Sequence, residues 1–121
     1  MPNNDQITKE DALFYLDMIN SKYGPTYKPK RGQSKGYYPL LKEKDSKEYN
    51  RFIRVYVYFK HNLKEREQTI LNLQYGINSN VLSLGEIGES IGVTSSRVSQ
   101  LRNRAERRLA SIIRDYVNGV K

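Results

Sequence analysis

The chain has 121 residues, with 21 lysines and arginines against 13 aspartates and glutamates, a net charge of +8. This length allows one small domain. The basic excess favours a polyanionic partner such as DNA, RNA or an anionic membrane surface; the alternative is that the charge only keeps the protein soluble. With no cysteine and a single histidine, disulfides are excluded and a nitrogen- or sulfur-ligated metal site nearly so. Because no apolar run reaches the roughly 18 residues of a membrane span and no signal peptide is recognisable, we expect a cytoplasmic, nucleoid-associated protein without membrane contact or cofactor.

The first helix is predicted over residues 7–22. Thr8 is a candidate N-cap, Asp11 stands three residues on to complete a capping box, and Ile7 can pack against Ala12. We expect the helix to run through the whole range, because the first Gly-Pro break follows it. The apolar face would be formed by Ala12, Leu13, Leu16 and Ile19.

Residues 23–46 are predicted to form a loop with at most a short hairpin, because their prolines and glycines prevent a helix. Within residues 24–38 basic side chains alternate with tyrosines, which can bind a nucleic-acid backbone and stack on bases. The other interpretation, which we favour, is a solvated loop whose tyrosines dock back onto the domain. The residues concerned are Lys28, Lys30, Arg31 and Lys35 with Tyr27, Tyr37 and Tyr38.

Residues 46–62 fit both a helical and an alternating, strand-like pattern, and we favour a helix capped by Asp45 or Ser46. Residues 63–76 are a clear helix that Gly76 closes.

Residues 82–109 indicate a helix, a tight turn and a second, strongly basic helix that continues to about Val117. Gly88 is small where two crossing helices approach, and Gly92 stands where the turn requires left-handed backbone angles. This is the pattern of a helix-turn-helix, whose second helix enters the major groove of DNA. The shared core would be formed by Ile87, Ile91, Val93, Val98 and Leu101.

These patterns together predict an all-α protein. Residues 1–45 would hold an N-terminal helix and the basic loop, and residues 46–121 a helical DNA-binding domain with its helix-turn-helix at 84–103.

Residues 63–109 resemble region 4 of the sigma-70 family, the part of bacterial sigma factors that reads the −35 promoter element. The first helix fits the family pattern at Leu63, Glu65, Arg66, Glu67, Ile70, Leu71, Leu73, Tyr75 and Gly76. The helix-turn-helix fits it at Leu84, Glu86, Ile87, Gly88, Gly92, Val93, Thr94, Arg97, Val98, Gln100, Leu101, Ala105, Arg108 and Leu109. The resemblance implies a helix-turn-helix that binds double-stranded DNA and can contact the flap of the RNA polymerase β subunit.

Two departures from the family pattern shape this expectation. Ser95, Ser96 and Ser99 occupy base-reading positions that are usually charged in the family, so the usual −35 hexamer is not assumed as the target. Residues 1–62 also show nothing resembling region 2, the part that melts promoter DNA. The resemblance therefore implies a stand-alone region 4-like regulator, as encoded by phages or bacteria, and not an autonomous sigma factor.

The predicted DNA-binding residues lie at the start of the second helix. Thr94 is the expected N-cap and can touch a phosphate, since a helix N-terminus attracts anions. Base readout is expected to rest on Gln100 and Asn103, because amides pair bidentately with adenine while serine discriminates poorly. The full set is Thr94, Ser95, Ser96, Arg97, Ser99, Gln100, Asn103 and Arg104, with Arg97 and Arg104 as phosphate contacts.

The remaining arginines of this helix have other expected places. Arg102 is expected over the edge of the groove, whereas Arg107 and Arg108 can pair with acidic neighbours or remain solvated. Glu86 and Glu89 are candidates to hold one arginine internally.

No catalytic constellation is recognisable, so we expect no enzyme. The leading interpretation is a sequence-specific DNA-binding transcription regulator that acts at promoters and contacts RNA polymerase. The alternatives are an interaction protein that binds polymerase without reading DNA, and a dimeric repressor or activator whose C-terminal helix pairs two copies.

Overall fold

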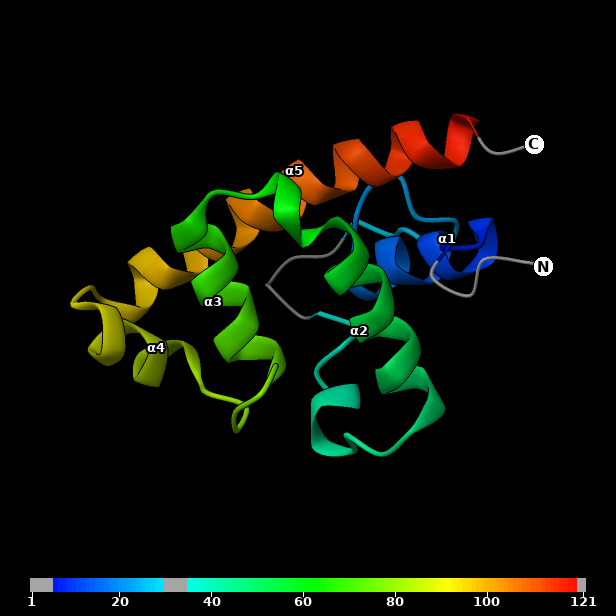
Figure 1. Cartoon of the computed structure of the whole chain (residues 1–121). Helices are drawn as coiled ribbons and strands as arrows, with labels where there is room; N and C mark the ends of the chain where they lie inside the picture. The colour runs from blue at the N-terminus through cyan, green and yellow to red at the C-terminus, as the bar shows by residue number, and fades with distance from the viewer. Residues whose placement is uncertain (1–5, 30–34, 120–121) are drawn as a thin grey trace.

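The computed structural model describes residues 6–29 and 35–119, and all the regular secondary structure within them is helical (Figure 1). This confirms the predicted all-α class; no strand or hairpin occurs among these residues. Two short 3₁₀ turns, Leu40–Lys42 and Lys60–Asn62, connect the longer elements. The α-helices are α1 Lys9–Met18, α2 Lys47–Phe59, α3 Glu65–Tyr75, α4 Leu84–Ile91 and α5 Ser95–Gly119.

Helix α1 begins as predicted and ends earlier. The Thr8 hydroxyl accepts the Asp11 amide at 3.1 Å, which confirms the N-cap. The Asp11 carboxylate binds α2, with its Oδ1 only 2.6 Å from the Arg51 Nε. The predicted run to residue 22 is wrong, because Asn20 adopts a left-handed φ of 56° and turns the chain back.

Most of the ambiguous segment 46–62 forms helix α2, as we favoured. The Ser46 hydroxyl accepts the Tyr49 amide at 3.0 Å and starts it. Its buried face follows the helical period and consists of Tyr49, Phe52, Val55, Tyr56 and Phe59.

Helix α3 ends as predicted at Gly76, which has a φ of 75°. The Ser83 hydroxyl and the Glu86 carboxylate form a capping box that starts α4, with distances of 3.1 and 2.9 Å.

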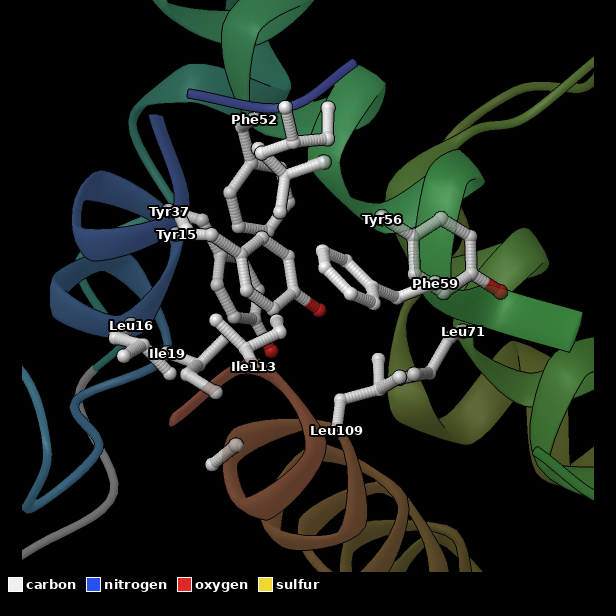
Figure 2. Packing of buried hydrophobic residues seen from close by; sticks show 14 of the residues in the cluster. Tyr15, Leu16, Ile19, Tyr37, Phe52, Tyr56, Phe59, Leu71, Leu109 and Ile113 are labelled. Carbon is white, nitrogen blue, oxygen red and sulfur yellow. The ribbon is translucent and has the colours of Figure 1, made fainter. Parts of the chain in front are cut away.

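The hydrophobic core has two parts that share α5. The larger part joins side chains from α1, α2, α3, the segment around Tyr37 and the C-terminal half of α5. Figure 2 shows Tyr15, Tyr37 and Phe52 gathered above Ile113 of α5, and the Tyr15 and Phe52 rings stack at 4.8 Å. The smaller part lies between α3 and the helix-turn-helix and consists of Ile70, Ile87, Val98 and Leu101.

The long helix α5 runs along one side of the molecule, in contact with α4 at its start and with α1 near its end (Figure 1). The larger core part contains residues from both predicted divisions, 1–45 and 46–121, and that division stays a prediction. None of the helices in the described part of the chain is long and apolar enough to cross a membrane.

Candidate DNA-binding surface

The turn between α4 and α5 has the geometry that its two glycines predict. Gly92 has a φ of 78°, a conformation that is cheap only for glycine. A Cβ atom on Gly88 would lie 2.5 Å from the carbonyl oxygen of Val93 and 3.4 Å from the amide nitrogen of Ser95, so the turn and the start of α5 fold back tightly onto α4 at this glycine. Because Ile87 and Val98 are fully buried between the two helices, the angle at which α5 is presented is fixed by packing.

The first turn of α5 is exposed and capped. The Thr94 hydroxyl accepts the Arg97 amide at 3.1 Å, which confirms the predicted N-cap. Thr94, Ser95 and Ser96 are all exposed, so the amide end of the helix faces outward. A helix N-terminus carries a partial positive charge and free N–H groups, which suit a phosphate.

The predicted site residues form one exposed strip along α5, with two partial exceptions. Arg97, Gln100 and Arg104 are exposed, and the Arg97 guanidinium lies 3.3 Å from the Gln100 side-chain oxygen. Ser99 and Asn103 are half-buried. The Asn103 side-chain oxygen accepts a hydrogen bond from the Arg102 Nε at 2.9 Å, so part of its hydrogen-bonding capacity is used within the chain.

Arg102 does not lie over the groove edge, and that prediction is wrong. The side chain is 1% exposed and points into the interior. Its Nη1 lies 3.2 Å from the Tyr37 hydroxyl and 3.1 Å from the Tyr38 hydroxyl. Burial by itself lowers the pKa of Arg102, but Tyr37 and Glu106 outweigh it and raise the pKa above its ordinary value. The guanidinium therefore stays charged in the interior.

The acidic partners of α5 also differ from the prediction. Glu86 caps α4 and does not hold an arginine internally; hydrogen bonds from the Ser83 backbone and hydroxyl lower its pKa. Glu89 is exposed. Arg108 does pair with an acidic neighbour, since its Nε lies 3.3 Å from the buried Glu67 carboxylate. The sequence hints at neither Glu67 nor Glu106 as an internal acid.

Residues 35–38 of the basic loop dock onto the domain, as the favoured interpretation expects, whereas the described residues at 25–29 are exposed. Lys35 Nζ lies 3.0 Å from the Glu106 carboxylate and donates to the Ile19 carbonyl at 3.1 Å. Tyr37 is fully buried and Tyr38 half-buried, whereas Tyr27 and Lys28 are exposed. The predicted basic residues Lys30 and Arg31 lie outside the described residues.

No group of three or more histidine, aspartate or glutamate side chains in the described residues is arranged to hold a metal ion. His61 is exposed in the middle of the second 3₁₀ turn.

Comparison with known proteins agrees with this geometry. Residues 61–111 match the family model for sigma-70, region 4. The chain carries a sigma-70 region 4-like segment. Over 54 residues the chain is 44% identical to the RNA polymerase sigma factor FliA of Pseudomonas aeruginosa. The aligned residues make up 45% of this chain and 21% of that sigma factor. No solved structure matches the chain.

The matched segment comprises α3, α4 and the first two-thirds of α5. Domains of this kind bind DNA and contact RNA polymerase in general, and they are not enzymes. Helices α1 and α2 and the docked residues Tyr37 and Tyr38 lie outside the match.

Proposed function

We propose that this protein is a sequence-specific DNA-binding transcription regulator that acts at promoters and contacts RNA polymerase. The observation that carries the proposal is the exposed, capped first turn of α5 on a rigidly packed helix-turn-helix. The match of this region to sigma-70 region 4 supports the same function. Such a protein works in the cytoplasm, at the nucleoid.

The proposed contacts divide into positioning and reading. Arg97 and Arg104 neutralise phosphates on one side of the helix, and the Thr94 end of α5 faces another phosphate. Gln100 is the main base reader, because its amide and the Arg97 guanidinium that binds its oxygen at 3.3 Å are both exposed, so the amide can turn to pair bidentately with adenine. Asn103 contributes less, since Arg102 already binds its side-chain oxygen. Ser95, Ser96 and Ser99 provide contacts of low discrimination.

The salt dependence of binding to random duplex DNA tests the proposal. Neutralising about four to six phosphates gives a slope of roughly −4 to −5 for log K against log salt. Arg97→Ala and Arg104→Ala should each flatten the slope by about one unit. Arg114→Ala is the matched control, because this arginine lies on the same helix but binds Asp115 and Tyr23 far from the first turn.

Base reading has its own test, on a site selected from random duplexes. Gln100→Ala should remove about 1–3 kcal/mol of discrimination at one base pair and leave non-specific affinity nearly unchanged. Equal loss of both affinities would make Gln100 a positioning residue.

The second candidate is a region 4-like protein that binds polymerase without reading DNA. Serines at positions 95, 96 and 99 favour it, because they supply little base discrimination. A salt slope near zero for the intact chain, together with retention on immobilised polymerase, would select this candidate.

A dimeric regulator has less support. The apolar side of α5 that would pair two copies packs inside the chain, against α1 and α2. The residues buried there are Leu109, Ala110, Ile113 and Val117.

A further inference from the structure

A short segment outside the region 4-like match holds the recognition half of α5 from behind. The segment is residues 35–38, and it contacts α5 through two layers of polar groups. In the first layer, the Tyr37 and Tyr38 hydroxyls accept hydrogen bonds from the Arg102 Nη1 at 3.2 and 3.1 Å, and the Gln74 side chain adds a third acceptor at 3.4 Å. Tyr37 is itself immobilised in the core, with its ring 5.2 Å from both Phe52 and Tyr75.

The second layer lies one helical turn further along α5. Glu106 is 2% exposed, and its carboxylate accepts the Tyr75 hydroxyl at 2.6 Å and faces the Lys35 ammonium at 3.0 Å. Residues four apart lie on the same side of a helix, so Arg102 and Glu106 present one charged face to the segment. Burial, followed by the nearby Glu106, raises the pKa of Tyr37 and of Tyr75 well above its ordinary value, so both hydroxyls stay protonated.

This arrangement restricts how α5 can rotate. A guanidinium is a planar fork with fixed donor directions, and a buried charge without partners is costly. Any rotation or shift of α5 that withdraws Arg102 from its acceptors therefore leaves a buried charge unsatisfied. Arg102 stands two residues after Gln100, and its Nε binds the Asn103 side chain directly. The same restraint thus fixes both predicted base readers.

We propose that residues 35–38 form an internal brace, and that Arg102 is a positioning residue through which the brace sets the register of Gln100 and Asn103 in the major groove. This inference rests on the proposed function, because it explains how a segment outside the DNA-binding module determines specificity. Base contacts need accurate placement, whereas phosphate contacts tolerate small rotations. Loss of the brace therefore lowers specific affinity more than non-specific affinity.

The test uses the full chain with Tyr37→Phe and Tyr38→Phe combined, which keeps both rings and removes the two hydroxyls that face Arg102. The matched control is Tyr23→Phe, because the Tyr23 hydroxyl accepts from Arg114 at 2.8 Å on the same helix but away from the recognition half. Because both charge-assisted hydrogen bonds that hold Arg102 to the brace are removed, we expect affinity for the selected site to fall about tenfold or more in the double variant. Affinity for random duplex should change less than about twofold, and the control should change neither. Tyr38→Phe alone, at a half-buried position, should give a smaller change in the same direction.

Amide hydrogen exchange of α5 provides a readout that needs no DNA. In the double variant, amides 98–104 should exchange faster than in the control, while amides of α2 stay protected. Should the intact chain fail to bind any duplex, the proposed function is wrong, and the exchange experiment still decides whether the brace exists. The brace is overturned if the intact chain binds its site and the double variant matches Tyr23→Phe in both specificity and exchange.

Discussion

Arg97, Arg102 and Arg104 belong to one helix and have different roles because of where the helical period places them. Arg97 and Arg104 are seven residues apart, two turns of a helix, and both are exposed. Arg102 falls on the opposite side, beside Leu101 and Ala105, and is buried. The net charge of +8 therefore overstates the charge available to a polyanion, since Arg102 and Lys35 are both engaged inside the protein.

Glycine at position 88 should be essential for the helix-turn-helix. The Cβ of Gly88→Ala would meet the Val93 backbone at 2.5 Å, and backbone cannot move aside without separating α4 from α5. We expect a loss of about 1–3 kcal/mol in the free energy of unfolding, measured by urea titration. The control is Gly85→Ala in the same helix, where the nearest atom is the Ser83 hydroxyl at 3.9 Å. An alanine there should be neutral or slightly stabilising, and equal effects of the two substitutions would contradict the close approach.

At the scale of whole elements, local caps decide where most helices start. Thr8, Ser46, Ser83 and Thr94 each accept a backbone amide three residues on. The first N–H groups of a helix have no carbonyl acceptor within the helix, and each of these hydroxyls supplies one. Start positions could therefore be predicted from sequence, because a cap and its amide are neighbours along the chain.

Removal of the α5 cap should lower the stability of the protein. Thr94→Ala should destabilise the protein by about 1 kcal/mol in urea titrations, because the Arg97 amide loses its acceptor. Thr94→Ser keeps the oxygen and should restore most of that stability. If Thr94→Ser lost as much stability as Thr94→Ala, the methyl group of Thr94 and not its hydroxyl cap would be responsible for the stabilisation.

At the scale of the molecule, α5 joins the two parts of the core. Its first turns pack in the helix-turn-helix, and its later turns pack against α1, α2 and α3. Neither part can lose α5 without exposing its own apolar surface, so the parts depend on each other.

We therefore expect a single cooperative unfolding transition in urea. Tyrosine fluorescence reports the larger core part, because the protein has no tryptophan and several tyrosines are buried there. Far-ultraviolet circular dichroism reports all helices. The two signals should give coincident transitions. An early partial loss of helix with unchanged fluorescence would show that α4 and the first turns of α5 unfold independently.

Alkaline pH should destabilise the protein through its buried tyrosines. Burial raises the pKa of Tyr15, Tyr37, Tyr56 and Tyr75 above the ordinary value of 10.0. Below pH 10 the folded and unfolded chains both keep these protons and stability is unaffected. As pH rises above 10 the unfolded chain releases protons that the folded chain retains, so stability falls by up to about 1.4 kcal/mol per pH unit for each tyrosine.

Urea titrations over a pH series would measure this loss, and tyrosinate absorbance would show which residues ionise in the folded protein. Tyr15, Tyr37, Tyr56 and Tyr75 should ionise only as the helices unfold. Ionisation of all ten tyrosines near pH 10 with native circular dichroism would contradict the burial that we describe.

The sequence by itself determined the helical class, the caps of α1 and α5, the two glycines of the turn and the exposed strip around Gln100. These depend on interactions between residues three or four apart, or on backbone angles of one residue, and such signals are local. The same locality explains why the end of α1 was missed: Asn20 turns the chain where Ser21 bonds back to Leu16, and no proline or glycine marks that position.

Only the tertiary structure decided which charged residues are internal. Helical periodicity places Arg102 on the side of Leu101 and Ala105, but its tyrosine partners are 64 and 65 residues away along the chain. Lys35 and Glu106 are likewise distant along the chain. Which polar groups satisfy each other in a core depends on how α1, α2 and the segment at 35–38 pack against α5, and helical periodicity carries no information about such long-range pairs.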